Sequence, residues 1–390
     1  MAMIEPASKS VAPAMPGEIS MTSRDSEQQE NALPRRSGSA DRDSDPVNPQ
    51  RRRLLGALPL AAMPALLFSP RSRAQASVAV QKLHSFAINV SDLERSLAFY
   101  QDVFGAAIQA RAADRISLRI GSGPQCFILQ TASSDEPVGF SHIGLSVADF
   151  DLDRIQQQLL GFGVQPAAPP APGSDRLDSA MRSWLRQRGE ARELFFADQE
   201  GVRYQLLPEN YCGGQGPLGT DCQAIEAAPE PGLFELLDIN HFTSFLANRD
   251  RANDFITAIF SKQFQAFQGP LSPVIGIGDG RQFLMYIGGS EPGRPANPGL
   301  IHHVSLAIAD FDVAGIRGKL SDYGLRPRPE GSAEQALMHW VSMRMPDRGG
   351  AEGGTPEVYF SDPDGIRIQM QDAAYCGGGG YLGDSCPPLN

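Results

Sequence analysis

Alternating apolar and polar residues near the C-terminus predict two strands joined by a tight turn. Within residues 357–369, apolar side chains occupy every second position on both sides of an Asp-Pro-Asp-Gly sequence at 362–365. Asp, Pro and Gly are residues that favour tight turns. Residues 193–205 repeat this pattern in a weaker form. The chain therefore contains the same structural motif at least twice, as an internal repeat.

The repeat extends upstream, where four strand-like segments each precede an amphipathic segment of helical period. The strand-like segments begin near residues 83, 141, 238 and 301. The predicted helices cover residues 93–104, 152–160 and 251–260, with a fourth that ends at Leu320. Ser91 or Asp92 is the predicted cap of the first helix. Short strand-like runs follow the helices, so we predict four βαβββ units and an α+β fold.

Length and charge narrow the classes of function. The chain has 390 residues, enough for two or three domains with their own cores. Its formal net charge is −11, which disfavours binding to nucleic acid because that function depends on excess positive charge. No segment has the roughly 20 consecutive apolar residues of a stable membrane span. We therefore expect a globular protein whose partner is a small-molecule substrate or ligand.

The N-terminal residues have a different composition. Residues 1–50 are rich in Ser, Pro and charged residues, and we expect a disordered leader there. Residues 51–76 begin with three consecutive arginines, continue with a short apolar run and end in an Ala-Gln-Ala sequence, the order of parts in an export signal. The arginines directly before the apolar run resemble a twin-arginine signal. An arginine-rich linker before a buried segment is the alternative. We expect an exported protein, periplasmic or extracellular.

The five cysteines form two pairs of equal spacing and one single residue. Cys212 and Cys222 have the same spacing as Cys376 and Cys386, and each pair brackets a glycine-rich segment. We expect two local disulfides, which agree with export to an oxidising compartment. Metal binding by these thiols is the alternative, although the spacing differs from the CxxC of structural zinc sites. Cys126 lies in an apolar segment and is predicted to be a buried free thiol.

Histidines are placed in register with the repeat. Four of the six lie near the start of the first strand of the four units: His84, His142, His241 and His303. A histidine on a strand is commonly only a partly buried polar residue, but four at repeated positions favour a functional origin. Two imidazoles with one oxygen donor form many catalytic metal sites. Gln205 and Gln369, each four residues beyond the turn glycine, are candidate oxygen donors, although a strand glutamine is more often solvated.

Together these features resemble the vicinal oxygen chelate superfamily, which includes glyoxalase I, type I extradiol dioxygenases and bleomycin- or fosfomycin-resistance proteins. The resemblance rests on the βαβββ units, the closing Asp-Pro-Asp-Gly-x-x-x-Gln sequence and the spaced histidines. It covers residues 82–210 and 237–375, which leaves 211–236 as a cysteine-containing tail and linker and 376–390 as a second tail. It implies that the units pair into two cupped mixed sheets, either within one chain or across a homodimer.

The resemblance also implies a site in each domain. Ligands of a divalent metal come from the first strand of each unit and the last strand of the second unit. This implies His84, His142 and Gln205 in the first domain, and His241, His303 and Gln369 in the second. Tyr359 corresponds to a tyrosine that hydrogen-bonds the substrate in extradiol dioxygenases, and we expect it to act in catalysis. The metal is expected to be iron or manganese, with zinc or nickel as alternatives.

Two features depart from the extradiol pattern. The last ligand there is Glu, whereas Gln205 and Gln369 are neutral and donate less charge to a metal. The segment before Tyr359 holds no acid–base histidine, for which Glu352 or a folded-back His339 is a conceivable substitute. Arg344 or Arg348 could neutralise an anionic group, although solvated arginines are the simpler interpretation. The first domain has Phe195 in place of the tyrosine, so the second domain is the expected active site.

Three functions follow from this sequence. The first is a metal-dependent enzyme that acts on a small oxygenated or aromatic substrate, in the manner of an extradiol dioxygenase or a glyoxalase. The second is a protein that binds and sequesters a small molecule without catalysis, because one fold hosts both functions. The third is a secreted structural protein with vestigial sites. Metal content and turnover distinguish the three.

Overall fold

The computed structural model describes residues 76–168, 180–222, 225–268, 272–278, 281–289 and 299–378. The predicted leader, the export signal up to Gln75 and Cys386 lie outside these residues. The strands and helices named below belong to one compact unit, which comprises residues 74–328 and 334–390. No helix among the described residues is long and apolar enough to cross a membrane.

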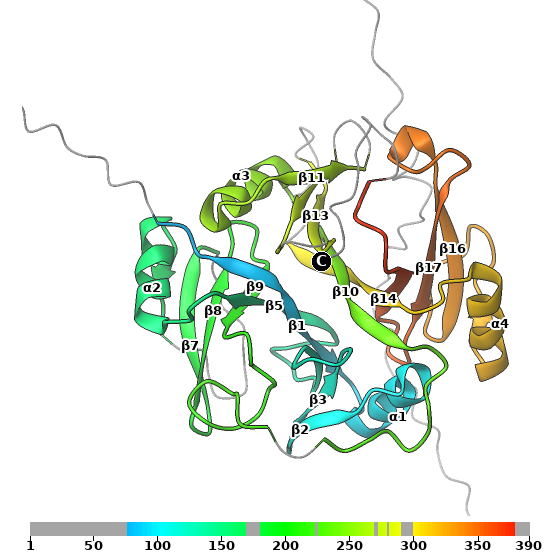
Figure 1. The fold of residues 1–390 in the computed structure, drawn as a ribbon, viewed down its shortest axis with the longest axis horizontal. Coiled ribbons are helices and arrows are strands. Elements are labelled where there is room, and N and C mark those ends of the chain that lie inside the picture. Colours follow the sequence, from blue (N-terminus) through cyan, green and yellow to red (C-terminus); the bar gives the residue numbers. More distant parts are fainter. Residues whose placement is uncertain are drawn as a thin grey trace, which may run out of the picture. The chain divides into compact units, whose positions relative to one another are not determined.

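The first domain is a nine-stranded mixed sheet, in the order β2-β3-β4-β1-β5-β9-β8-β7-β6 (Figure 1). The long central pair β1 and β5 is antiparallel, and each of these strands pairs in parallel with the last strand of its own unit. The strands are β1 (Val80–Val90), β2 (Ile108–Ala112), β3 (Arg115–Arg119), β4 (Cys126–Thr131), β5 (Gly139–Val147), β6 (Gln165–Pro166), β7 (Arg182–Arg188), β8 (Ala191–Ala197) and β9 (Arg203–Leu207).

The second domain repeats this sheet, in the order β11-β12-β13-β10-β14-β18-β17-β16-β15. Its central antiparallel pair is β10 and β14, which again pair in parallel with β13 and β18. The strands are β10 (Leu236–Phe245), β11 (Phe264–Phe267), β12 (Pro273–Gly276), β13 (Phe283–Ile287), β14 (Leu300–Ile308), β15 (Arg326–Pro327), β16 (Met338–Arg344), β17 (Thr355–Ser361) and β18 (Arg367–Asp372).

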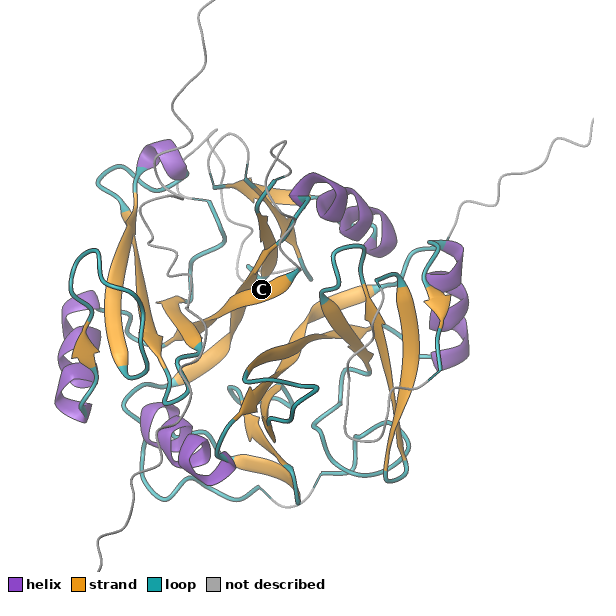
Figure 2. Cartoon of the chain, turned by 180° about the vertical axis from the view of Figure 1, so that it is seen from behind, coloured by secondary structure: helices purple, strands orange, loops and turns teal. Residues whose placement is uncertain are grey.

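Four α-helices follow the four long strands, as the sequence predicts. They are α1 (Leu93–Phe104), α2 (Leu152–Gly161), α3 (Arg249–Phe260) and α4 (Val313–Tyr323), and a short 3₁₀ helix η1 spans Pro346–Arg348. An Asp or Asn side chain caps the N-terminus of each α-helix by accepting a backbone N–H three residues on. The α3 helix starts two residues earlier than predicted because Asn248 is its cap. In Figure 2 the helices lie beside the sheets, one with each unit.

Alternation along the strands separates two faces of each sheet. One face carries large apolar residues such as Phe86, Phe127 and Tyr204, which pack with the helices in a single buried cluster. That cluster includes residues of both sheets, and Phe86 contacts Phe242 with ring centroids 5.7 Å apart. The opposite face of each sheet carries buried polar residues and is called its cup below.

The closing turn of each domain contacts the first helix of the other domain. Glu200 accepts the backbone N–H groups of Ala247 and Asn248 at the start of α3, at 2.9 and 3.1 Å. Asp364 holds the corresponding turn position and accepts the N–H of Ser91, before α1, at 2.9 Å. A carboxylate at a helix N-terminus is favourable because the helix dipole is positive there. Gly365, with φ of 81°, supplies the left-handed conformation that this turn requires.

The predicted α+β fold of paired βαβββ units in two mixed sheets is confirmed. One difference is an extra two-residue edge strand in the second unit of each domain, β6 and β15, which pairs in parallel with the next strand. The other concerns the segment 176–192, which the charged sequence leaves unassigned. Its described part forms β7 and the start of β8, because β7 pairs along its whole length with β8.

Candidate metal centre and its counterpart in the first domain

A row of directly paired residues crosses the second-domain cup. His241 on β10 pairs with Ser305 on β14, which pairs with Gln369 on β18. The row continues to Tyr359 on β17 and Trp340 on β16. Residues paired across strands face the same side of a sheet, so these side chains share the cup. Three of the predicted site residues, from three different strands, are thereby brought together.

His303 joins the row from the side. It lies two positions before Ser305 on β14 and therefore faces the same cup. Its ring is 5.7 Å from the ring of His241 and 5.5 Å from that of Tyr359, between centroids. Both histidines are almost completely buried. The structure thus places together the two imidazoles, the amide and the phenol that the sequence predicts for this domain.

Hydrogen bonds orient the two imidazoles. Nδ1 of His241 donates to Oδ1 of Asn240 at 2.7 Å, which assigns the lone pair of the neutral ring to Nε2. Nδ1 of His303 contacts Nδ1 of His302 at 2.8 Å. A metal-ligating imidazole commonly has its second nitrogen fixed in this way. Nε2 of each ring is therefore the nitrogen that faces a ligand.

Burial keeps both imidazoles neutral. It lowers the pKa of His241 to about 3, with a further contribution from Arg344, while the nearby Gln369 amide opposes the shift. Burial likewise holds the pKa of His303 well below its usual range, and the neighbouring His302 and His241 act in the same direction. Neutral imidazole is the form that coordinates a metal.

Gln369 is the most unusual residue of the row. It is fully buried and lies close enough to His241 to influence that residue's pKa, yet neither its Oε1 nor its Nε2 makes a well-formed hydrogen bond among the described residues. A buried unpaired amide is destabilising, so such a group usually serves a ligand. Gln369 lies on β18, which is paired with β14, the strand that carries His303 and Ser305. We conclude that the two imidazoles and this amide fit a divalent metal with open positions.

Tyr359 belongs to a buried polar chain. Its hydroxyl donates to Glu357 at 3.0 Å, and Glu357 pairs with Arg344 at 2.7 Å. Burial and the Glu357 carboxylate raise the pKa of Tyr359 well above its usual value. The phenol is therefore protonated, its proton is donated to Glu357, and its oxygen is able to accept a hydrogen bond. Sequence reasoning missed Glu357, although Glu193 stands at the same position of the repeat.

The other residues considered for a role beside Tyr359 differ in burial and in the side of the sheet that they face. Arg344 is not a solvated arginine, because its side chain is 11% exposed and paired with Glu357, whereas Arg348 is exposed. His339 does not fold back toward the site. It lies next to Trp340 on β16, faces the opposite side of the sheet and bonds Ser321 of α4 at 2.9 Å. Glu352 is exposed in the loop before β17.

The first-domain cup carries the same row with different residues. Ser85 on β1 pairs with Gly144, which pairs with Gln205, and Gln205 pairs with Phe195. The last member, Trp184, pairs with Phe195. His142 lies two positions before Gly144, as His303 lies before Ser305. The row thus keeps the positions of His142 and Gln205 but has serine where the second domain has His241.

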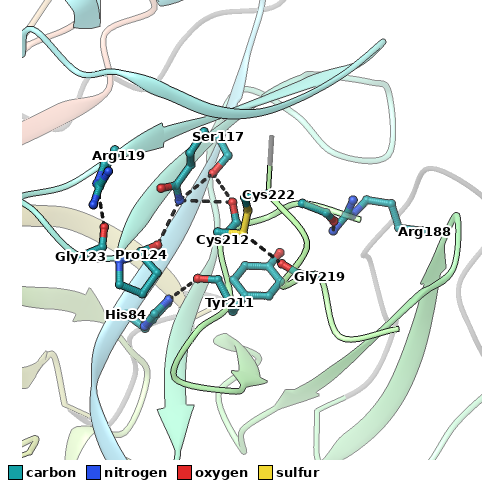
Figure 3. The surroundings of a disulfide bond; sticks show 12 residues. His84, Ser117, Arg119, Gly123, Pro124, Arg188, Tyr211, Cys212, Gly219 and Cys222 are labelled. Carbon is teal, nitrogen blue, oxygen red and sulfur yellow. Dashed lines mark hydrogen bonds between the residues drawn. A yellow bond between two sulfur atoms is a disulfide. The ribbon is translucent and has the colours of Figure 1, made fainter. Parts of the chain in front are cut away.

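His84 occupies the position of Asn240, one residue from the predicted register. It lies in a β-bulge between Leu83 and Ser85, and its Nε2 donates to the carbonyl of Tyr211 at 2.7 Å (Figure 3). Asn240 donates to the carbonyl of Tyr375 at 2.8 Å. Aligning Leu83–Phe86 with Ile239–Phe242 would have revealed this offset. With one imidazole in the row and His84 bonded elsewhere, the first-domain cup does not fit the predicted metal.

The cysteine-containing tails cover the cups. In Figure 3 the carbonyl of Cys212 accepts the hydroxyl of Ser117 at 2.9 Å, and the Cys212–Cys222 disulfide closes the tail. In the second domain, the carbonyl of Cys376 accepts the amide of Gln265 at 2.8 Å. Cys376 is also disulfide-bonded, while Cys126 is the buried free thiol that the sequence predicts.

Among the residues that the structure describes, no group of three His, Cys, Asp or Glu side chains is placed to hold a metal ion. The candidate centre of the second domain differs from such groups because its third member is an amide. Together, the repeated mixed sheets and the His–His–Gln face define a cupped-sheet protein with one candidate metal centre.

Comparison with known proteins agrees with this class. The family model of the Glyoxalase/Bleomycin resistance protein/Dioxygenase superfamily matches residues 82–206. Metallothiol transferase FosB of Lysinibacillus sphaericus is 21% identical over 132 residues, which are 33% of this chain and 82% of that protein. Glutathione transferase FosA of Serratia marcescens is 23% identical over 130 residues, 33% of this chain and 80% of that protein.

A solved structure extends the likeness of fold to both domains. The substrate complex of homoprotocatechuate 2,3-dioxygenase from Brevibacterium fuscum with 3,4-dihydroxyphenylacetate has a TM-score of 0.51 and 15% identity. The match covers 76% of this chain and 81% of that chain. Residues 82–206 therefore match the model of the Glyoxalase/Bleomycin resistance protein/Dioxygenase superfamily, and the second sheet repeats the strand order of the first.

Proposed function

We propose that this protein is a metal-dependent enzyme whose active site is the second-domain cup. The observation that carries the proposal is the common face of His241, His303 and Gln369, with both amide atoms of Gln369 buried and unpaired. These residues would hold a divalent ion, with iron or manganese favoured and zinc or nickel as alternatives. When bound, the metal would act as a Lewis acid that chelates two adjacent oxygen atoms of a substrate.

The side chains of the cup define what such a substrate would meet. Tyr359 offers a protonated hydroxyl beside His303, and Trp340 stacks on Tyr359 with centroids 5.4 Å apart. A flat aromatic wall with one hydrogen-bond acceptor, the Tyr359 oxygen, suits a small aromatic molecule that carries adjacent hydroxyl groups. Glu357 accepts the hydroxyl proton of Tyr359 and is paired with Arg344, so these two residues hold the tyrosine in position. These features, with the fold shared with ring-cleaving dioxygenases, support ring opening of a catechol-like substrate as the reaction.

A second candidate function is binding without catalysis. Gln369 donates less charge than the glutamate of extradiol enzymes, and neither His339 nor Glu352 supplies an acid–base group beside Tyr359. The relatives FosB and FosA are named as transferases, so they favour the enzymatic function over this alternative. Oxygen consumption with catechol as probe separates the two, because a binding protein gives only stoichiometric binding.

We also propose that the protein works outside the cytoplasm. The arginine-rich segment that begins at Arg51 supports export, and the Cys212–Cys222 disulfide agrees with an oxidising compartment.

The test is metal content of the purified full-length protein, compared with two matched variants. His241→Ser gives the second domain the residue that stands at this position in the first, and Ser85→Ala changes the corresponding residue of the other domain. We expect about one equivalent of metal in the wild type and in Ser85→Ala, and a loss of at least tenfold in metal affinity in His241→Ser.

The identity of the metal directs the next step. If the metal is iron or manganese, the next assay is turnover of catechol with oxygen. If it is zinc or nickel, the next assays are for isomerase or lyase reactions. Metal retained by folded His241→Ser, or no metal in the wild type, would overturn the proposed centre. Circular dichroism of each variant verifies that the fold is kept.

A further inference from the structure

The first-domain cup contains several buried hydrogen-bond donors without partners. Nε2 of Gln205, the hydroxyl of Ser85, Nε1 of Trp184 and Nη2 of Arg115 are all buried and make no hydrogen bond with the described residues. Ser85, Gln205 and Trp184 belong to one row of paired strands, so they face the same space. Each buried donor without an acceptor costs stability, which points to a missing acceptor-rich partner.

Arg115 reaches this space from the other side of the cup. It lies on β3, and its Nη1 approaches Glu193 of β8 at 3.9 Å, although four other strands separate β3 from β8 in the sheet. The contact is possible because the sheet curves around the cup. Arg115 nevertheless remains only 5% exposed, so its charge is buried. A buried guanidinium with one loosely placed carboxylate favours a second anion.

Glu193 is already saturated by other groups. It accepts Arg186 at 2.6 Å, Arg188 at 2.9 Å and the hydroxyl of Tyr211 at 2.8 Å. Burial opposes ionisation of Glu193, but Arg186, Arg115 and Arg188 outweigh it and hold the pKa of this carboxyl well below its usual range. One ionised carboxylate therefore binds the guanidinium groups of Arg186 and Arg188 and the hydroxyl of Tyr211, and it leaves Arg115 at 3.9 Å without a close partner.

The remaining walls of the cup are apolar. Trp184 stacks on Phe195 with centroids 5.4 Å apart and an interplanar angle of 15°. Ala87, Ile128 and Leu207 form a buried cluster with Cys126 and Tyr211 on the same side of the sheet. A ligand here would meet donors and a guanidinium at one end and flat or aliphatic surface at the other. This is the arrangement of a small-molecule site with a few orienting polar groups.

We propose that the first-domain cup is a binding site for a small carboxylate that carries an apolar or aromatic group. Arg115 pairs with the carboxylate, because a guanidinium matches its planar geometry. Gln205 and Ser85 donate to its oxygens, and Trp184 with Phe195 contacts the apolar part. Because Ser85 stands at the position of His241, this cup lacks the second imidazole of the metal centre and offers a donor for an anion in its place. The site is independent of the reaction proposed for the second domain.

The experiment measures benzoate binding to the full-length protein by calorimetry and by fluorescence of Trp184. The chain has two tryptophans, so a Trp340→Phe background makes Trp184 the reporter. We expect saturable binding with a Kd below about 1 mM. Arg115→Gln is expected to weaken binding at least tenfold, whereas Arg111→Gln, an exposed arginine paired with Glu226, is expected to bind as the wild type does.

Gln205→Met provides the second variant. Removing an unpaired buried amide is expected to raise the Tm, since no hydrogen bond is lost, while benzoate affinity falls. A purely structural role for Gln205 predicts no fall in affinity. Absence of binding, equal affinity in Arg115→Gln, or binding of inorganic phosphate in preference to benzoate would each overturn the proposal.

Discussion

Ser85 and His241 occupy the same position in the two domains. Ser85 pairs with Gly144 and Cys126, and His241 pairs with Ser305 and Phe283, at matching points of matching strands. The neighbouring His84 and Asn240 also correspond, and each donates to a tyrosine carbonyl of the following tail. Among the candidate ligand positions, the single difference of Ser85 for His241 therefore separates a cup that fits a metal from one that does not.

Replacement of His84 by asparagine tests this assignment. We expect His84→Asn to keep the wild-type metal content and a similar Tm, because asparagine makes the same bond to a carbonyl in the second domain. Metal analysis and thermal unfolding provide the measurements. A fall from two equivalents of metal to one would show instead that His84 is a ligand, as the family resemblance implied.

Tyr359→Phe separates catalysis from metal binding. The variant loses the hydrogen bond to Glu357 and should be less stable by about 1–2 kcal/mol. Phenylalanine is accommodated at the corresponding position of the first domain, so the fold is expected to persist. Metal content should be unchanged, while kcat on a catechol probe should fall roughly tenfold or more.

The control for this variant is Tyr323→Phe. Its hydroxyl bonds Asp102 outside both cups, so the change should leave turnover unaffected. Unchanged turnover in Tyr359→Phe would remove the tyrosine from the proposed site.

The buried Asp198 carboxyl should contribute a stabilisation that is lost as pH rises from about 4 to 7, in opposition to the buried neutral histidines, whose stabilisation increases over the same interval. Burial raises the pKa of Asp198 to about 7, above its ordinary 3.8, although the backbone N–H groups of Glu200 and Val202 oppose the shift. The folded state therefore binds a proton that the unfolded state releases, and this contribution is present below pH 4 and lost through pH 7. Asp362 occupies the same turn position in the second domain. Burial raises its pKa to about 6, so its contribution to stability changes with pH in the same direction.

Asp198→Asn removes the titrating group while it preserves an acceptor for the two N–H groups. The slope of unfolding free energy against pH, measured between pH 4 and 7 by urea denaturation, should become more positive in the variant, because the negative contribution of Asp198 is removed. The difference across this interval is expected to be on the order of a few kcal/mol, since one pKa unit corresponds to about 1.4 kcal/mol. An identical slope in the variant would refute the assignment.

Opening the Cys212–Cys222 disulfide should destabilise the first-domain tail. The bridge closes a loop with a sequence separation of 10, for which the chain-entropy model gives about 3 kcal/mol. Cys222→Ser is expected to lower the Tm and to expose Tyr211, which the tail holds against Glu193. Cys126→Ala should show no such exposure, because Cys126 forms no disulfide. Acrylamide quenching of Trp184 would report access to the cup.

Local patterns in the sequence determined much of the architecture. Alternation of apolar residues set the strands, the capping residues Asp92 and Asp312 set two helix starts, and the repeated Asp-x-x-Gly turns set the closing hairpins. These features depend on neighbours along the chain, so a single sequence contains them. The same repeats pointed to His241, His303, Gln369 and Tyr359 as one site.

Only the tertiary structure decided which of these residues meet. A β-bulge at the matching residues His84 and Asn240 turns both side chains out of the rows that contain Ser85 and His241, and spacing along the chain does not show where a bulge lies. Curvature of the sheet brings Arg115 to Glu193, and it leaves Gln205 and Gln369 buried without partners. The sequence by itself determined the repeat and the second-domain candidates. Long-range pairing across the sheet decided that the two cups differ in chemistry, because bulges and curvature arise from contacts between distant strands.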